Sequence, residues 1–388
     1  TKGRIGEGEG SYAVYLSPFY YGEVGVAGRL RQLLALSESR LGVYRGVMWD
    51  VLLMETDGQE TNVHLSERQK EAVRTALTRK VTVLTGGPGT GKTTTVRTII
   101  DLLEQFRCRY ALASPTGRAA KRLAETTGRP AKTVHRLLGY VPGEGFKHND
   151  GNPMDVDMLI VDEASMLDLL LFNHLLKAVH PATHLLLVGD VDQLPSVGAG
   201  NVLRDIIDSG SVPVVSLDLI FRQAQDSMIV TNAHRINKGL MPEFPKGDTD
   251  FYLFGQDDPE KAADLVVDIV QNRIPRKFGY DPMGAIQVLS PMHRGAVGVG
   301  NLNARLQAAL NPPSPQKAER RLAGRAFRVG DRVIQHRNNY NLDVFNGDIG
   351  RIEAIDALNH TLHVRIDDRL VSYDWSEADE LGLAYRPA

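Results

Sequence analysis

A glycine-rich loop between an apolar run and an apolar-periodic segment limits the possible folds more than any other feature of this sequence. Residues 81–85 read Val-Thr-Val-Leu-Thr, and residues 86–93 read Gly-Gly-Pro-Gly-Thr-Gly-Lys-Thr, which fits the P-loop pattern Gly-x-x-x-x-Gly-Lys-Thr. The segment that follows has helical spacing of its apolar residues. Such a loop joins a buried strand to a helix whose N-terminus holds a phosphate with backbone N–H groups. The sequence therefore predicts an α/β domain with a phosphate site at a strand end.

The pattern also predicts what the loop residues do. Lys92 would contact the β- and γ-phosphates of ATP, and Thr93 would bind Mg²⁺. The residues expected to hold the nucleotide are Gly87, Pro88, Gly89, Thr90, Gly91, Lys92, Thr93 and Thr94.

A second apolar run, Leu159-Ile-Val161, ends in the adjacent carboxylates Asp162 and Glu163. We expect Asp162 to hold Mg²⁺ through water and Glu163 to polarise an attacking water. A helix cap placed at the end of the strand would use the same residue types. The P-loop upstream favours the catalytic interpretation.

Two further segments carry candidates for the γ-phosphate. Gln193 lies in Gly189-Asp-Val-Asp-Gln-Leu-Pro195 and could contact that phosphate, whereas Asp190 and Asp192 could equally serve turn and cap chemistry. Arg222, in Phe-Arg-Gln, could neutralise charge that develops during hydrolysis.

Apolar runs alternate with helical segments from residue 65 to about residue 220, which predicts a parallel sheet buried on both faces. The expected strands are Val81–Thr85, Tyr110–Ala113, Met158–Val161, Leu185–Val188 and Val212–Leu217. Residues 139–157 interrupt this rhythm with Gly, Pro, Asn and Asp, and indicate an exposed loop or hairpin.

A second α/β block and a β-rich module follow. The block is predicted to contain strands Phe251–Phe254 and Ala285–Leu289 and helices near Glu260–Gln271 and Asn301–Leu310. Residues 327–375 hold short β-like runs separated by turn signals, typical of a small β-barrel.

Composition narrows the class of protein. The 388 residues include 45 Lys and Arg and 47 Asp and Glu, so the net charge of −2 excludes a histone-like basic binder but not a local basic groove. The single cysteine excludes an intramolecular disulfide framework and a cysteine-based zinc site. No run approaches the ~20 apolar residues of a membrane span, so we expect a cytoplasmic protein.

Basic side chains cluster where a nucleic-acid strand could bind. Residues 118–136 include several Lys, Arg and His after the strand-end sequence Ser-Pro-Thr-Gly, which suits phosphate contacts without base reading. A solvated basic helix face is the alternative. His293 and Arg294 are either a second grip on the strand or surface charge. The low aromatic content, 6%, makes base stacking the weaker expectation.

Taken in order, these motifs resemble those of superfamily 1 DNA helicases, and in particular the stand-alone bacterial RecD-type branch. The resemblance rests on the P-loop, on Asp162-Glu-Ala164, on the stretch GDVDQLPSVGAG at 189–200 and on Phe221-Arg-Gln223. Further matches are the segments around Pro115–Arg118, Thr133–Arg136, Val288–Gly295 and Val344–Gly350.

The resemblance implies a fold class of two RecA-like P-loop motor domains with parallel sheets, the second incomplete and carrying an SH3-like β-barrel insertion. It implies these ranges: N-terminal segment 1–60, first motor domain 61–220 with a wedge hairpin at 139–157, second motor domain 221–325, SH3-like barrel 326–376, and a return to the second motor domain at 377–388.

The resemblance also implies residue roles. Gln69 would read adenine, although its place three residues after Ser66 also fits a helix capping box. Arg222 would contact the γ-phosphate. The residues implied to bind DNA are Pro115, Thr116, Gly117, Arg118, Thr133, His135 and Arg294.

The family has two further motifs after an Ala-Tyr start, and this sequence stops at Ala384-Tyr-Arg-Pro-Ala388. On that ground we expect the second motor domain to lack its C-terminal strands and one catalytic arginine, and the chain to bind nucleotide better than it hydrolyses it.

The expected function is an ATP-dependent 5′→3′ DNA helicase or translocase of DNA repair or recombination. It would act on single-stranded DNA and 5′-tailed duplexes as a monomer with Mg²⁺. Two alternatives remain open: a nucleotide-gated single-strand DNA-binding subunit or scaffold without unwinding, and an RNA helicase of the same superfamily.

Overall fold

The computed structural model describes residues 2–4, 12–56, 65–141, 143–217, 227–245, 247, 249–339 and 341–385. By its internal contacts the chain divides into two compact units, Thr1–Phe251 and Tyr252–Ala388. No helix among these described residues is long and apolar enough to cross a membrane.

The first unit is built on a six-stranded parallel sheet with strand order β10-β3-β9-β8-β4-β5. Its strands are β3 (Val81–Thr85), β4 (Tyr110–Ser114), β5 (Ala131–Thr133), β8 (Met158–Val161), β9 (His184–Gly189) and β10 (Val214–Ser216). Every residue of β3, β8 and β9 is buried, because helices cover both faces. The predicted parallel sheet is therefore confirmed.

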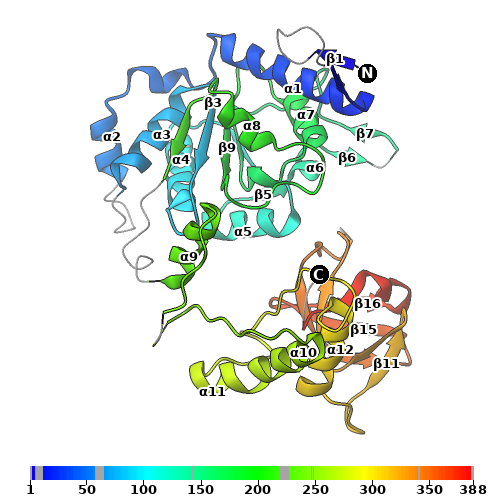
Figure 1. Ribbon diagram of the computed structural model, residues 1–388. Coiled ribbons are helices and arrows are strands. Elements are labelled where there is room, and N and C mark those ends of the chain that lie inside the picture. Colours follow the sequence, from blue (N-terminus) through cyan, green and yellow to red (C-terminus); the bar gives the residue numbers. More distant parts are fainter. Residues whose placement is uncertain are drawn as a thin grey trace. The chain divides into compact units, whose positions relative to one another are not determined.

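Two apolar cores sandwich this sheet (Figure 1). On one face α1 (Ser17–Ala35), α7 (Leu169–Ala178) and α8 (Val202–Asp208) pack against Val81 and Val83. On the other face the 3₁₀ helix η1 (Gly42–Gly46), α2 (Trp49–Thr56), α3 (Glu67–Thr78) and α4 (Lys92–Gln105) pack around Leu84. Val83 and Leu84 face opposite cores, which explains why apolar residues in this strand do not alternate regularly with polar ones.

Shorter elements surround the sheet. Strands β1 (Lys2–Arg4) and β2 (Tyr12–Val14) form an antiparallel pair near the N-terminus. Helix α5 (Gly117–Thr127) follows β4, and α6 (Val134–Leu137) follows β5. Residues 139–157 contain the predicted hairpin, formed by β6 (Tyr140–Val141) and β7 (Gly145–Phe146). Helix α9 (Met228–Asn237) completes the unit.

The second unit combines helices with an antiparallel sheet. Helix α10 (Pro259–Asp268) continues through a π-helical turn (Ile269–Arg273) into α11 (Ile274–Phe278), and α12 is Val299–Leu310. Strands β11 (Glu319–Leu322) and β12 (Arg325–Arg328) form a hairpin. The five-stranded sheet has the order β16-β15-β14-β13-β17, with β13 (Arg332–Gln335), β14 (Ile349–Asp356), β15 (Thr361–Ile366), β16 (Arg369–Asp374) and β17 (Leu381–Leu383).

This sheet packs on a core that contains the fully buried Tyr373 of β16 and Phe327 of β12. The β-rich module expected from the turn signals is therefore confirmed. A 3₁₀ helix (Trp375–Glu380) leads into β17, which pairs antiparallel with β13, so the sheet extends beyond residue 376.

Two strand predictions for the second α/β block were wrong. Residues 251–254 and 285–289 form no strand, and the described strands of the second unit pair only antiparallel. Ile286 and Val288 pack against the small core of Val270, Leu306 and Tyr385. An extended segment becomes a strand only when a neighbour takes its backbone groups, and here the Ile286 carbonyl accepts from the Arg332 side chain at 2.7 Å instead.

Candidate nucleotide and nucleic-acid site

The P-loop connects β3 to α4 as predicted, and its glycines are needed for two reasons. Gly91, the N-cap of α4, has a left-handed backbone with φ of 88°, which other residues adopt at a cost. At Gly86 a Cβ would lie 2.8 Å from the Leu217 carbonyl oxygen, so no side chain fits there. The loop therefore folds tightly at the carboxyl end of β3, where the first turn of α4 presents its backbone N–H groups.

The Lys92 ammonium group lies inside this loop. It donates to the carbonyl oxygens of Gly86 and Gly87, the latter at 2.9 Å. The buried Thr90 hydroxyl also donates to Gly87, at 2.8 Å, and stiffens the loop. Thr93 is exposed and Thr94 half-buried on the first turn of α4. The loop thus gathers an ammonium group, hydroxyls and helix-start N–H groups, which are donors suited to a polyphosphate.

Asp162 and Glu163 follow β8 at the same edge of the sheet. The Asp162 N–H donates to the Ala113 carbonyl at 2.9 Å, and Glu163 has a left-handed backbone with φ of 52°. Burial raises the pKa of both carboxyls, Asp162 raises that of Glu163 further, and the positive charge of Lys92 opposes both shifts. These coulombic contributions place Lys92 and the two carboxylates in one cluster, as the sequence predicted.

Arg122 of α5 also belongs to this cluster, because its charge lowers the pKa of both Asp162 and Glu163. The sequence pattern placed Arg122 only among the basic residues of the strand-binding segment. Its helix starts at the carboxyl end of β4, next to β8 in the sheet, and this adjacency becomes visible only with the strand order.

Asp190 and Gln193 follow β9, the strand between β3 and β8. Asp190 is 4% exposed; its carboxylate accepts from the Asp192 backbone N–H at 3.0 Å and from the Gln193 side-chain amide at 3.3 Å. The turn chemistry considered for Asp190 is therefore present. The Gln193 side chain folds onto this carboxylate.

A cavity of about 460 Å³ adjoins the P-loop within the first unit. Gly87, Gln193 and the end of β10 line one part of it, and α9 lines another through Ile229, Ala233 and His234. The buried Thr85 hydroxyl, also in the lining, has no hydrogen-bond partner among the described residues. The contribution of α9 was missed from the sequence, since no motif marks residues 228–237.

Gln69 lies at the start of α3 and forms the capping box considered for it. Its amide oxygen accepts from the Ser66 N–H at 2.8 Å and its own N–H donates to the Ser66 hydroxyl at 3.3 Å, which completes a capping box. Its amide nitrogen donates to the Gly91 carbonyl at 3.3 Å. Only 2% of Gln69 is exposed, so this one side chain ties the helix start to the P-loop.

The expected strand-contact residues of the first unit lie at the ends of β4 and β5. These two strands are neighbours, with Ser114 paired to Thr133. Thr116 and Thr133 are the N-caps of α5 and α6, each accepting a backbone N–H. Pro115 and Gly117 flank Thr116, and the Arg118 side chain is exposed. The carboxyl edge of one sheet therefore carries these residues and the P-loop cluster.

Aromatic rings gather at the base of the β6–β7 hairpin, although the low aromatic content made base stacking the weaker expectation for DNA binding. Phe146 lies 5.0 Å from Tyr140, 5.9 Å from His135 and 4.5 Å from His174, measured between ring centroids. Burial lowers the pKa of both histidines. His174 of α7 packs in this cluster. Tyr140 is 47% exposed, so the cluster presents a ring at the hairpin.

Two further predicted residues are Arg222 and Arg294. Arg222, with Phe221 and Gln223, lies outside the described residues. Arg294 is exposed on a second-unit loop that Ser290 fastens by donating to the Val297 carbonyl at 2.7 Å.

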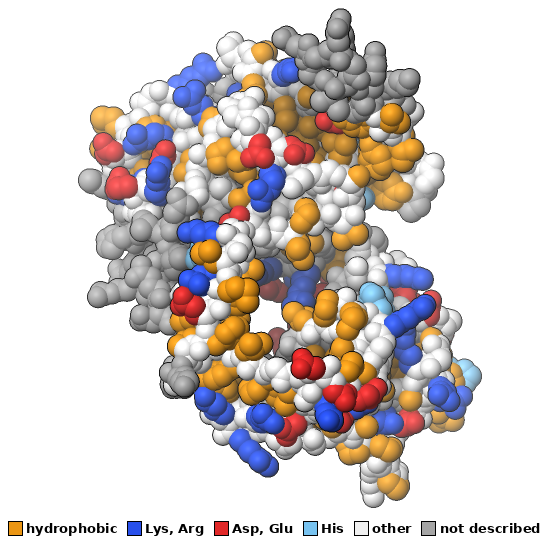
Figure 2. Space-filling model, in the orientation of Figure 1, with side chains coloured by type: hydrophobic (Ala, Val, Ile, Leu, Met, Phe, Trp, Pro, Cys, Tyr) orange, Lys and Arg blue, Asp and Glu red, His pale blue; other side chains and the backbone are white. Residues whose placement is uncertain are grey.

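Charge is mixed on the surface. On the face shown in Figure 2, Lys and Arg side chains are interspersed with Asp and Glu on each unit.

Comparisons with known proteins agree with the order of these parts. Residues 69–199 match the AAA domain model, and residues 302–366 match the SH3 domain of ATP-dependent RecD-like DNA helicases. The chain is 41% identical over 321 residues to the ATP-dependent RecD2 DNA helicase of Deinococcus radiodurans, which covers 83% of this chain and 42% of that protein. It is 34% identical over 322 residues to the RecBCD enzyme subunit RecD of Mycolicibacterium smegmatis, covering 74% of this chain and 57% of that one. The chain thus spans about half the length of these relatives.

Solved structures show a similar fold. A Pif1 helicase from a study of DNA unwinding at forked duplexes matches with a TM-score of 0.51 and 19% identity, over 84% of this chain and 82% of that one. The Pif1 helicase of Candida albicans matches with a TM-score of 0.50 and 19% identity, over 84% and 85%.

Proposed function

Since this chain is homologous to the RecD-type helicases over most of its length, we propose that it acts as an ATP-driven 5′→3′ translocase and helicase on single-stranded DNA. The observation that carries the proposal is that two kinds of site share one sheet edge. The ends of β3 and β8 carry Lys92 and Glu163, and the ends of β4 and β5 carry Thr116 and Thr133.

The residues present suit a nucleoside triphosphate with Mg²⁺. Lys92 would bind the β- and γ-phosphates, while Thr93 and Asp162 supply oxygen ligands of the kind Mg²⁺ prefers. The metal would neutralise phosphate charge during hydrolysis. Glu163, whose pKa is raised by burial and by Asp162, would accept a proton from the attacking water. Gln193 would turn from Asp190 toward the γ-phosphate, and Gln69 would contact the base.

Strand binding and hydrolysis would be coupled through the connected elements. The Arg122 charge on α5 acts on the Asp162 and Glu163 carboxylates, so a change of charge at the nucleotide would be felt at the start of this helix. Thr116 caps α5 and would hold a DNA phosphate, together with Gly117 and Arg118. Pro115, Thr133 and His135 would complete this contact.

The remaining assignments belong to the same proposal. Arg222 would contact the γ-phosphate, Arg294 would hold the strand on the second unit, and the β6–β7 hairpin would separate the strands of a duplex. We assign residues 61–220 to the first motor domain, 221–325 and 377–388 to the second, and 326–376 to the SH3-like module. The protein would work as a cytoplasmic monomer in DNA repair or recombination.

The test measures ATP hydrolysis by the chain with and without oligothymidylate or oligouridylate, and unwinding of duplexes with a 5′ or a 3′ tail. We expect stimulation by DNA and unwinding only from the 5′ tail. A Glu163→Gln variant should retain nucleotide binding and lose hydrolysis, whereas Glu125→Gln, an exposed change on α5, should behave as wild type.

Three outcomes would redirect the proposal. Nucleotide-dependent DNA binding without hydrolysis or unwinding would favour a gated binding subunit. Stimulation by RNA alone would favour an RNA helicase, and unwinding from the 3′ tail would contradict the polarity.

A further inference from the structure

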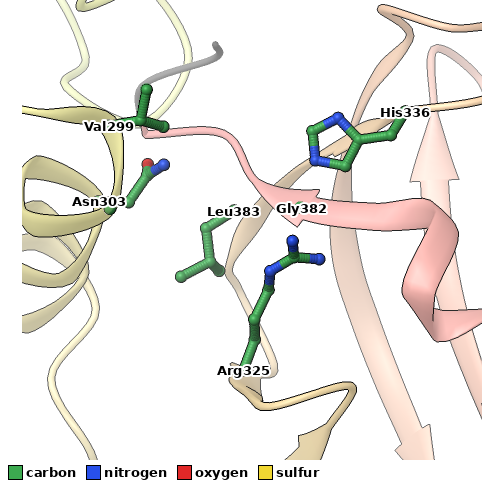
Figure 3. A pocket seen from close by; sticks show the side chains of 7 residues that line it. Val299, Asn303, Arg325, His336, Gly382 and Leu383 are labelled. Carbon is green, nitrogen blue, oxygen red and sulfur yellow. The ribbon is translucent and has the colours of Figure 1, made fainter. Parts of the chain in front are cut away.

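Two places outside the nucleotide site bring side chains from distant segments together. The first is a cavity of about 210 Å³ in the second unit, between α12 and the antiparallel sheet (Figure 3). There Arg325 donates to the Leu381 carbonyl at 2.7 Å, and Gly382 leaves room for the His336 ring, so these side chains help to fasten β17. The second place, in the first unit, joins α1 to the loop 147–152, which follows the β6–β7 hairpin.

The β6–β7 hairpin is too short to keep its own direction. Each of its strands has two residues, and an isolated two-stranded hairpin is at best marginally stable in water. The hairpin projects from the side of the first unit (Figure 1), and Tyr140 and Val141 are exposed on it. Contacts with the rest of the first unit must therefore fix where the hairpin points.

The loop that follows the hairpin is a firm continuation of it. The His148 N–H donates to the Leu138 carbonyl at 3.0 Å, across the base of the hairpin. Asn149 and Asn152 exchange backbone hydrogen bonds of 3.2 and 3.1 Å, so the loop closes in a tight turn that contains Asp150. The Asp150 carboxylate therefore moves together with the hairpin.

Arg29 of α1 binds this turn. Its Nη2 and Nε atoms donate to the two Asp150 carboxylate oxygens, at 2.8 and 3.3 Å, so the ion pair is bidentate. The Arg29 side chain is partly buried and that of Asp150 is exposed. Between described residues, no other ion pair holds the loop 147–152. A bidentate pair fixes direction as well as distance.

Helix α1 is a firm base for this contact because it packs closely on α7. At Gly25 a Cβ would lie 2.7 Å from the Asn173 Oδ1 atom of α7, so the two helices are close there. Val26 and Leu33 of α1 are buried in the core on one face of the parallel sheet. Arg29 lies one turn after Gly25 on the same side of α1. The ion pair therefore ties the hairpin loop to a helix of the core.

The base of the hairpin is held separately, by rings. Phe146 of β7 packs against the same core and lies 4.5 Å from the His174 ring of α7, measured between centroids. Contact at a single point lets a hairpin pivot, whereas a second contact on another helix fixes its direction. The ring contacts and the Arg29–Asp150 pair together supply two such points.

We propose that Arg29 is a positioning residue for duplex separation, which acts by holding the β6–β7 hairpin in one direction through its ion pair with Asp150. The proposal rests on the proposed function, in which this hairpin separates the strands of a duplex, and adds to it a residue outside the motor motifs. Many exposed ion pairs contribute nothing measurable, and bidentate geometry is an exception. The alternative is a surface pair without effect on unwinding.

Hydrogen–deuterium exchange of the full chain tests the contact itself. Arg29→Gln should speed exchange at the hydrogen-bonded N–H groups of the loop 147–152 about fivefold, which corresponds to about 1 kcal/mol for the lost pair. The matched control is Arg31→Gln, an exposed change on the same helix, which should leave this exchange as in wild type. Exchange in α4 should be the same in both variants. Equal loop exchange in the two variants would overturn the proposal.

Unwinding of a 5′-tailed duplex measures the consequence of the contact. Arg29→Gln and Asp150→Asn should each slow unwinding two- to fivefold, because the effect cannot exceed the shift in hairpin population. ATP hydrolysis with oligothymidylate, and its KM for ATP, should stay as in Arg31→Gln, since the P-loop cluster is untouched. The double variant Arg29→Asp with Asp150→Arg should recover most of the unwinding, because it returns opposite charges to the same two positions.

The results that would overturn this proposal differ from those that would overturn the proposed function. Unwinding by Arg29→Gln equal to that of Arg31→Gln, hydrolysis that falls in parallel with unwinding, or no recovery in the double variant would each refute the positioning role and leave the helicase proposal standing. A wild-type chain that unwinds no duplex would refute the helicase proposal and the role of Arg29 in unwinding together, while hydrogen exchange still shows whether the ion pair holds the hairpin.

Discussion

Gln69 caps α3 and bonds to the P-loop, and we propose that it also contacts the nucleotide base; two single substitutions separate capping from the proposed role. Ser66→Ala removes only the hydroxyl that accepts from the Gln69 N–H at 3.3 Å, at a cost of about 1 kcal/mol for a lost cap. Gln69→Ala removes the bonds to the Ser66 N–H and to the Gly91 carbonyl. With about 1 kcal/mol more for the second bond, we expect a loss of about 2 kcal/mol in the free energy of unfolding.

Thermal melting followed by circular dichroism measures these costs. For a domain of this size 1 kcal/mol corresponds to about 2–4 °C, so Gln69→Ala should lower the melting temperature about twice as much as Ser66→Ala. Fluorescent ATP and GTP analogues then measure binding. We expect Gln69→Ala to weaken ATP binding at least ~10-fold more than Ser66→Ala, which is about 1.4 kcal/mol, and to reduce the preference for ATP. Equal ATP affinities in the two variants would refute a role for Gln69 beyond capping.

Three further predictions concern buried ionisable groups. Burial and the charge of Asp162 raise the pKa of Glu163, so ATP hydrolysis should be lost at a pH above the ordinary glutamate range as the solution is acidified. Loss of hydrolysis only within the ordinary glutamate range would contradict a buried base at this position. Burial lowers the pKa of His184 from 6.5 to about 4, so the unfolded state binds a proton more readily than the folded state as the pH falls through this window. The free energy of unfolding from urea titrations should therefore drop by about 2 kcal/mol between pH 7 and 5. In a His184→Gln variant the contribution of this histidine to the drop should be absent. The buried Asp331 carboxylate accepts from Gln307, Asn311 and the Tyr385 hydroxyl, so Asp331→Ala should destabilise the second unit by about 3 kcal/mol or more; an unchanged second-unit melting transition would contradict this network.

The parallel sheet of the first unit could be predicted because its sequence signals are local and agree with each other. Short apolar-rich runs without regular polar alternation indicate cover on both faces, and the loop at Gly86–Lys92 fixes where a strand ends and a helix starts. The barrel could be predicted from its turns, such as Asn346-Gly347. Strand 285–289 was predicted from the same apolar signal and was wrong, since a strand also needs a partner that its own residues do not specify.

The residues of the site also divide into those that the sequence could predict and those that it could not. Lys92, Asp162 and Glu163 could be brought together from sequence because each belongs to a loop or helix start that follows a strand of one parallel sheet, and parallel strands end at one edge. Arg122 and the α9 residues could not, since their positions depend on which strands are neighbours and how a helix docks.

The most direct test of the central claim is strand-stimulated ATP hydrolysis by a Lys92→Ala variant. The Lys92 side chain donates to the loop carbonyls of Gly86 and Gly87, so the variant loses only these contacts and should fold. Thermal melting followed by circular dichroism checks this. The matched control is Lys177→Ala in the last turn of α7, on a helix away from the P-loop. We predict that Lys92→Ala abolishes hydrolysis in the presence of oligothymidylate while Lys177→Ala retains it. Hydrolysis that survives in a folded Lys92→Ala protein would contradict the assignment of the nucleotide to the P-loop.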